Sequence, residues 1–104
     1  MARYFTIPYA FTKSDECPSV GVDRPILNWI ESRTEGAITV VACGHFYEAY
    51  LEDAVRLARV EELVLTSKSA GDVGRIPLCG FPLHSLKRHT AQLLQAGIPL
   101  LVLS

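Results

Sequence analysis

The sequence predicts a single α+β domain, α/β-like in its alternation, in which a mixed β-sheet of five or six strands is flanked by about three helices. Two observations predict this class. Short runs of apolar and β-branched residues alternate with segments of helical periodicity, and glycine or proline separates most of them. The length of 104 residues suffices for one modest hydrophobic core and not for two. We therefore expect residues 1–104 to form one domain.

The first part of the chain is expected to form a strand, a loop and a helix. Arg3 to Phe11 is rich in aromatic and β-branched residues, although Pro8 would restrict this strand to a sheet edge. Ser14 to Gly21 has the composition of a loop. Asp23 can cap a helix that runs from about Arg24 to Arg33. The buried stripe of this helix would consist of Ile26, Leu27, Trp29 and Ile30.

Two strands and a helix are expected in the middle of the chain. Ala37 to Cys43 is a continuous apolar run, which is typical of a strand covered on both faces. Gly44 permits a tight turn into a second strand, His45 to Leu51. Glu52 and Asp53 then begin a helix, because negative charge is favoured at the positive end of the helix dipole. Its buried side would consist of Ala54, Leu57 and Ala58.

Two further short strands are expected after this helix. Glu62 to Thr66 has strand composition, and Ser67 to Arg75 is polar and contains two glycines, which predicts a flexible loop. Ile76 to Cys79 is the second strand, and Gly80-Phe81-Pro82 is expected to end it.

A last helix and a closing strand complete the predicted fold. The helix covers about Leu83 to Ala96 and ends at Gly97, a residue type that favours the left-handed conformation after a helix. Pro99 precedes the closing strand, Leu100 to Leu103. The helix is expected to direct four side chains inward, namely Leu86, Thr90, Leu93 and Leu94.

Charge and cysteine content restrict the possible partners and the compartment. Ten basic and eleven acidic residues give a net charge of −1, so no global positive field attracts nucleic acid and any contact with DNA must be local. Cys17, Cys43 and Cys79 are odd in number and widely spaced, which favours reduced, buried thiols. No secretory signal is recognisable, and the longest apolar run, Ile98 to Leu103, is too short to span a membrane. We expect a soluble cytoplasmic protein without membrane contact.

One aromatic residue and one carboxylate are paired in the segment Gly44-His45-Phe46-Tyr47-Glu48. On a strand, side chains two residues apart share a face, so Phe46 and Glu48 point the same way. Burying a glutamate beside a phenylalanine is costly unless the carboxylate is paired. An exposed ring beside a hydrogen-bonding carboxylate suits recognition of a flat ligand, whereas an ordinary core phenylalanine and a solvated glutamate are the structural alternative.

Several motifs of the second half match a known family in order and spacing over about Ile38 to Leu103. They are Gly44-His45-Phe46-Tyr47-Glu48, Leu51-Glu52-Asp53-Ala54, Leu65-Thr66, Ser69-Ala70-Gly71 and Ile76-Pro77-Leu78-Cys79-Gly80-Phe81-Pro82-Leu83-His84. In these residues the chain resembles the N-terminal mismatch-recognition domain, domain I, of the MutS family of DNA mismatch repair proteins. The resemblance implies a DNA-binding domain with a mixed sheet, in which Phe46 stacks on a mispaired base from the minor groove and Glu48 hydrogen-bonds that base.

The chain also departs from the family pattern. His45 stands where members usually carry an acidic residue, and Ser67-Lys68 stands where two adjacent cations are usual. The loop Asp72 to Arg75 is longer than in most members. The family continues into ATPase domains, but these 104 residues contain no Gly-x-x-x-x-Gly-Lys-Ser/Thr motif, so no ATP site is expected in this chain.

The resemblance makes double-stranded DNA with a mismatch or distortion the expected partner. Lys68, Arg75, Lys87 and Arg88 are the candidate contacts to the DNA backbone. So few cations predict weak binding by the isolated domain, on the order of 10⁻⁴ M. For Lys87, Arg88 and His89, the solvated face of a helix remains the alternative.

The sequence lacks the patterns of a structural zinc site and of one common nuclease class. The spacing of Cys43, His45, Cys79 and His84 differs from that of structural zinc sites, and no acidic residue stands two positions before a lysine, as in one common nuclease class. We expect no enzyme activity, no catalytic residues, no metal and no cofactor. The alternative function is a protein-interaction module that has lost DNA binding and associates with a repair protein or with itself as a homo-oligomer.

Overall fold

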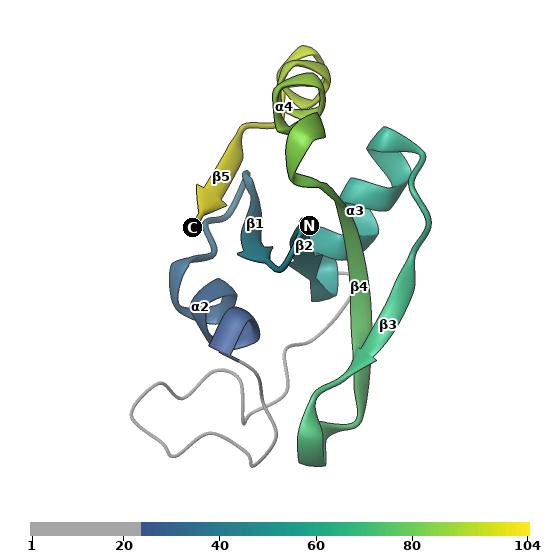
Figure 1. Ribbon diagram of the computed structural model, residues 1–104. Coiled ribbons are helices and arrows are strands. Elements are labelled where there is room, and N and C mark those ends of the chain that lie inside the picture. The colour runs from purple at the N-terminus through teal and green to yellow at the C-terminus, as the bar shows by residue number, and fades with distance from the viewer. Residues whose placement is uncertain (1–23) are drawn as a thin grey trace.

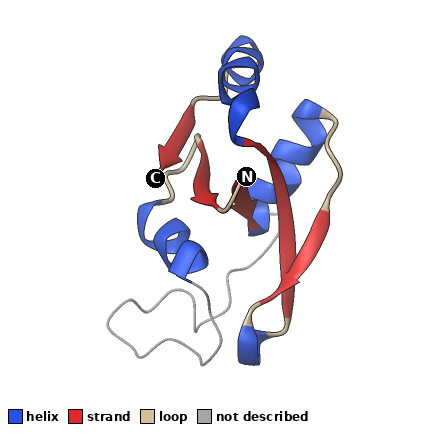
Figure 2. Cartoon of the chain, in the orientation of Figure 1, coloured by secondary structure: helices blue, strands red, loops and turns tan. Residues whose placement is uncertain are grey.

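A computed structural model describes residues 24–104 of the chain. Within these residues a five-stranded sheet with the strand order β3-β4-β2-β1-β5 is flanked by three α-helices (Figures 1 and 2). Only β5 pairs in parallel, with β1, and the other described pairings are antiparallel. The predicted mixed-sheet α+β fold is therefore confirmed. The predicted strand Arg3 to Phe11 and the loop Ser14 to Gly21 lie outside the described residues.

The helices and strands have the following bounds. The helices are α2 (Arg24–Ser32), α3 (Leu51–Glu61) and α4 (Leu86–Gln95), and two short 3₁₀ turns are η1 (Gly71–Val73) and η2 (Leu83–Ser85). The strands are β1 (Ile38–Cys43), β2 (Phe46–Tyr50), β3 (Thr66–Ser69), β4 (Arg75–Pro82) and β5 (Leu100–Leu103). The predicted helix over Arg24 to Arg33 and the strands after Gly36 and Pro99 are confirmed within one residue.

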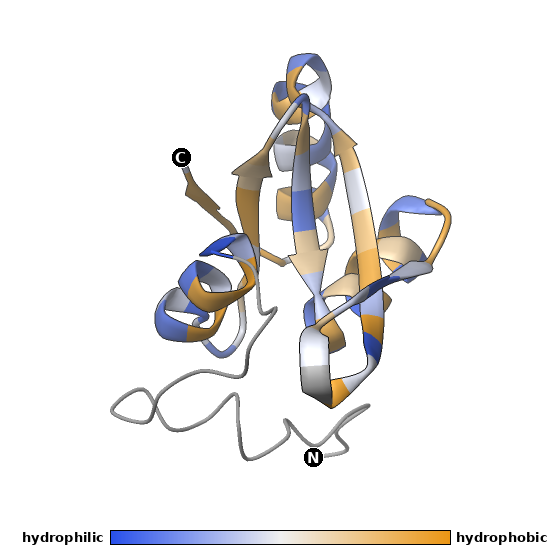
Figure 3. Ribbon diagram, turned by 60° about the horizontal axis from the view of Figure 1, so that its bottom comes forward, coloured by the Kyte–Doolittle hydropathy of each residue, from blue (hydrophilic) through white to orange (hydrophobic). Residues whose placement is uncertain are grey.

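Both faces of the sheet are covered by helices, because alternate residues of each strand point to opposite sides. On one face, Ile26 and Trp29 of α2 pack against β1, β2 and β4. On the other face, Leu57 of α3 and Leu93 of α4 pack against the same three strands. Figure 3 shows the apolar character of β5 at one side of the sheet. The two core clusters thus share the central strands.

The strand β2 turns directly into α3 at Leu51, which has a φ of 56°. This left-handed conformation is strained for a residue with a bulky side chain and costs about 1–3 kcal/mol. Leu51 is buried, so packing holds it in place. The sharp turn carries the start of α3, with Glu52 and Asp53, beneath α2 and β1.

The predicted strand Glu62 to Thr66 is wrong. Glu62 ends α3 in the left-handed conformation with a φ of 56°, and the Leu63 amide donates to the Ala58 carbonyl oxygen in a typical helix-ending arrangement. Val64 is 83% exposed, so this β-branched residue packs against no neighbouring strand, and its intrinsic preference for strands is not enough to form one. The strand begins only at Thr66.

The predicted loop Ser67 to Arg75 and the predicted break at Gly80 are also wrong. Thr66–Ser69 forms β3, which pairs with β4 through the short turn η1. β4 continues from Arg75 to Pro82 without a break, and Gly80 lies within it opposite Glu48. The glycine is required by a close approach of backbones, because a Cβ at this position would lie 2.7 Å from the Tyr47 carbonyl oxygen.

The last helix has a different inward face from the one predicted. Leu94 is 57% exposed, whereas His89 is buried and Leu93 is fully buried. His89 lies three residues after Leu86 and four residues before Leu93, which is the spacing of one helix face. The 3₁₀ turn η2 also delays the start of the α-helix from Leu83 to Leu86.

Candidate nucleic-acid interface

Phe46 is the first residue of β2 and is exposed at one end of the sheet. Its neighbours across the two flanking strands are Cys43 on β1 and Pro82 on β4. The hairpin that precedes it turns at Gly44, where φ is 63°. The phenylalanine is 46% exposed, far more than Tyr47, which points to the opposite face and packs on Phe81 with ring centroids 5.8 Å apart.

Glu48 shares the face of Phe46 and is held by two neighbours. The Tyr50 hydroxyl donates a hydrogen bond of 2.7 Å to Glu48 Oε1. Lys68 Nζ lies 3.7 Å from the same oxygen and 5.5 Å from the centre of the Tyr50 ring. The side chains of Lys68 and Glu48 are 20% and 18% exposed, so the pair is largely removed from water. The carboxylate therefore avoids the cost of unpaired burial that the sequence pattern raised.

The structure separates the four cations that the sequence suggested as backbone contacts. Lys68 lies beside Glu48, as described above. Arg75 begins β4 and binds Ser67 through the hydroxyl and the carbonyl oxygen, both at 2.9 Å. Seven residue steps of roughly 3.3 Å place it roughly 23 Å along β4 from Pro82, the neighbour of Phe46. Lys87 and Arg88 are exposed on the first turn of α4, soon after Pro82 in the chain.

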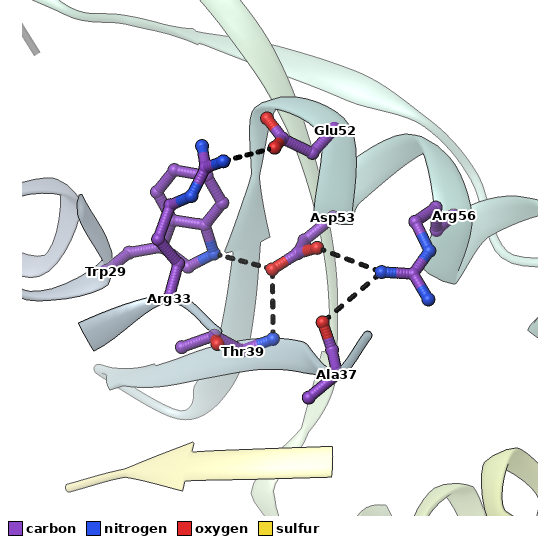
Figure 4. A network of polar contacts seen from close by, with 7 residues as sticks. All are labelled: Trp29, Arg33, Ala37, Thr39, Glu52, Asp53 and Arg56. Carbon is purple, nitrogen blue, oxygen red and sulfur yellow. Dashed lines mark hydrogen bonds and ion pairs between the residues drawn. The ribbon is translucent and has the colours of Figure 1, made fainter. Parts of the chain in front are cut away.

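A buried polar network connects α3 to α2 and β1 (Figure 4). Asp53 Oδ2 accepts hydrogen bonds from Trp29 Nε1 at 3.1 Å and from the Thr39 amide at 3.0 Å. Asp53 Oδ1 lies 3.6 Å from Arg56 Nη1, which also donates to the Ala37 carbonyl oxygen at 3.2 Å. Burial raises the pKa of Asp53 to about 6, although the hydrogen bonds from Thr39 and Trp29 and the charge of Arg56 oppose this rise.

The two acidic residues that begin α3 have a different role from the one that the sequence predicted. Glu52 and Asp53 are buried rather than placed at the surface to balance the helix dipole. Glu52 Oε2 lies 2.8 Å from Arg33 Nη2, and the Arg33 guanidinium lies 5.2 Å from the centre of the Trp29 ring. The partners are distant in sequence, so no local pattern could have revealed these contacts.

A second buried pair joins α3 to α4. His89 Nδ1 lies 2.6 Å from Glu61 Oε1, and both side chains are almost fully buried. The imidazole also stacks on Phe81 with centroids 4.5 Å apart. The sequence suggested DNA contact or a solvated helix face for Lys87, Arg88 and His89, and for His89 the solvated face is wrong because the imidazole is buried. The spacing of His89 from Leu86 and Leu93 was the signal that could have shown its burial.

Cys79 of β4 is fully buried in the core. Burial raises the pKa of the Cys79 thiol to about 11, which agrees with its predicted packing role. Over residues 24–104, no three His, Cys, Asp or Glu side chains are grouped closely enough to hold a metal ion. No helix in this same part of the chain has the length and apolar character needed to cross a bilayer.

The comparisons with known proteins agree with the observed fold. The sequence matches the family MutS domain I over residues 28–103. A DNA mismatch repair protein MutS from a Synechococcus species is 47% identical over 66 residues, which are 64% of this chain and 8% of that protein. MutS of Trichormus variabilis is 38% identical over 73 residues, 70% of this chain and 8% of that protein.

A third relative gives the same result. MutS of Bacillus cereus is 38% identical over 68 residues, which are 65% of this chain and 8% of that protein. The chain thus spans less than a tenth of the length of these relatives. The family match includes every described strand and most of α2. The chain belongs to the MutS domain I family.

Proposed function

We propose that this chain is a recognition module for mismatched or distorted double-stranded DNA, with Phe46 as the residue that stacks on the weakened base. The observation that carries the proposal is the exposed ring of Phe46 beside Glu48 on one face of β2, in a chain of the MutS domain I family. Glu48 hydrogen-bonds the same base. The chain acts by binding and not by catalysis.

The selectivity of such a module follows from the stability of the DNA. Opening one step of intact duplex costs a few kcal/mol, and a mismatched step costs less because it pairs and stacks poorly. Stacking of an aromatic ring on a base is worth about 1–3 kcal/mol. Insertion of Phe46 therefore offsets the cost at a mismatched step and falls short at a sound one, so the preference reflects deformability rather than base sequence.

Electrostatics keep the binding weak. The net charge of −1 gives no long-range attraction to DNA, and Arg75, Lys87 and Arg88 are the exposed cations assigned here to phosphate contacts. So few contacts predict an affinity on the order of 10⁻⁴ M and a shallow dependence on salt. Linkage to a second DNA-binding unit would raise this affinity by orders of magnitude without any new contact.

The test compares the binding of matched and mismatched duplexes by fluorescence anisotropy at low salt. Phe46→Ala should weaken binding to the mismatched duplex by about fivefold or more, since it removes the stacking energy, and should change binding to the matched duplex little. Val64→Ala, a change at another exposed apolar residue, is the control and should alter neither. Equal affinity of the wild-type protein for both duplexes would refute the proposal.

A second function, protein interaction, is favoured by the connection between α3 and β3. Val60 at the end of α3 and Val64 and Leu65 after it are exposed, and a hollow of about 420 Å³, lined mostly by polar residues, lies between the ends of α3 and α4. Exposed apolar side chains that lie together are typical of contact sites for another chain. Self-association measured by analytical ultracentrifugation, and lost in Val64→Asp, would favour this function.

A further inference from the structure

Tyr50 and Lys68 form a support for Glu48 that the proposed function does not by itself require. Both groups contact the same carboxylate oxygen, Oε1, at 2.7 Å and 3.7 Å. The other oxygen, Oε2, is then the one that would meet a base. A side chain as flexible as glutamate loses rotamer freedom when it binds a ligand, and prior fixation reduces this cost.

Tyr50 is well placed to impose such an orientation. Its ring is fully buried and meets the Trp29 ring edge to face, with centroids 6.3 Å apart. Trp29 is itself held by the hydrogen bond from its indole nitrogen to Asp53. The Tyr50 hydroxyl therefore occupies a defined position, from which it donates to Glu48. A contiguous series of contacts thus runs from the buried network of α3 to the carboxylate.

Lys68 has a different environment from the other candidate cations. Its ammonium group lies over the Tyr50 ring and beside Glu48, and its side chain is only 20% exposed. Arg75, Lys87 and Arg88 are instead exposed. Lys68 on β3 pairs with Ile76 and Glu48 on β2 pairs with Gly80, so the lysine side chain extends diagonally across β4 to reach the carboxylate. A lysine in this position neutralises the glutamate where it would otherwise repel approaching phosphates.

We propose that Tyr50 and Lys68 are positioning residues that determine mismatch selectivity by holding Glu48, and that Lys68 serves as the counter-ion of Glu48 rather than as a phosphate contact. The inference rests on the proposed function. Its distinctive consequence is that the effects of Tyr50 and Lys68 on selectivity depend on Glu48. A phosphate contact would act whether or not Glu48 is present.

The test is a set of double-mutant cycles on the ratio of affinities for mismatched and matched duplexes. Tyr50→Phe and Lys68→Met should each lower this ratio by about threefold or more, since each removes a contact to a charged carboxylate. In the Glu48→Ala background the same two changes should leave the ratio unchanged. The exposed cation Lys87 is the matched comparison, and Lys87→Met should weaken binding to both duplexes equally in either background.

The outcomes separate this inference from the proposed function. Loss of selectivity in Phe46→Ala, together with full selectivity in Tyr50→Phe and Lys68→Met, would overturn the inference and leave the proposed function intact. Equal weakening of both duplexes by Lys68→Met, with or without Glu48, would show a phosphate contact and overturn the assignment of Lys68. Unchanged selectivity in Phe46→Ala would overturn both proposals. Urea unfolding of each variant verifies that the domain is still folded.

Discussion

At the scale of single residues, several buried polar side chains are held by partners that are far away in the sequence. Asp53 accepts hydrogen bonds from residues 24 and 14 positions away, and Glu61 pairs with a histidine 28 positions away. Removing one member of such a buried pair leaves the other unsatisfied, which costs about 1–3 kcal/mol or more. Phe46 is the opposite case, because its exposed ring contributes little to the core and is available for contact.

The raised pKa of Asp53 predicts how stability depends on pH. The pKa is about 6 in the folded protein against 3.8 for an exposed aspartate, so the folded state holds this proton more tightly. The stabilisation is fully present below about pH 4 and is lost as the pH rises through about 6, with a total change of about 3 kcal/mol. Asp53 contributes stability at low pH because burial penalises the charged form of its carboxylate.

Comparison with Asp53→Asn isolates this contribution, since asparagine does not titrate. Urea unfolding at several values between about pH 4 and pH 7 should show the wild-type protein losing stability relative to the variant as the pH rises. If the difference in unfolding free energy between the two proteins stays constant with pH, or grows in favour of the wild type as the pH rises, the assignment of the raised pKa to Asp53 is wrong.

At the scale of elements, β4 is the central strand of the candidate interface. It lies between β3, which carries Lys68, and β2, which carries Phe46 and Glu48. The strand also brings Pro82 opposite Phe46 and leads through η2 into α4. The close approach of β4 to β2 at Gly80 lies directly beside Glu48.

Gly80→Ala tests this arrangement of strands. The added Cβ would meet the Tyr47 carbonyl oxygen at 2.7 Å, a contact that only a shift of the backbone can relieve. We expect a loss of about 1–3 kcal/mol in the free energy of unfolding, measured in urea. Gly44→Asn is the control, because asparagine tolerates the φ of 63° and no atom lies within 4 Å of the added Cβ. Equal stability of Gly80→Ala and the wild type would show that β2 and β4 can move apart at this position without cost, and would contradict the prediction.

At the scale of the whole molecule, two core clusters are joined through one sheet. The first cluster contains Trp29 and Tyr50, and the second contains Leu57, Phe81 and Leu93. Adjacent residues of β1, Val40 and Val41, belong to different clusters because a strand directs alternate side chains to opposite faces. Because both clusters pack on the same central strands, unfolding of these strands exposes the apolar residues of both clusters.

The shared sheet predicts cooperative unfolding. The chain has one tryptophan, Trp29, and it is fully buried in the first cluster, so its fluorescence reports on that side alone. Far-ultraviolet circular dichroism reports on all helices and strands. The two signals should change at the same urea concentration, as expected for a small single domain. Two separate midpoints would show that the clusters unfold independently.

The division between local and tertiary information is visible in particular residues. The periodicity of Ile26 and Trp29, the apolar run that became β1, and the Pro99 before β5 were sufficient to predict those elements, because hydrophobic period and turn chemistry act within a few residues. Alternation along β2 likewise predicted that Phe46 and Glu48 share a face. The motifs around these residues were specific enough to indicate the family, which the match over residues 28–103 confirms.

Other features depended on contacts between residues far apart in the chain. Val64 has a β-branched side chain but no strand beside it, and Gly80 continues a strand that composition alone would end. Glu48, Asp53 and His89 each have a partner on another element, namely Lys68, Trp29 and Glu61, and these contacts form only when the elements are assembled. Propensity describes what one residue prefers locally, whereas burial and pairing depend on which surfaces the complete fold brings together.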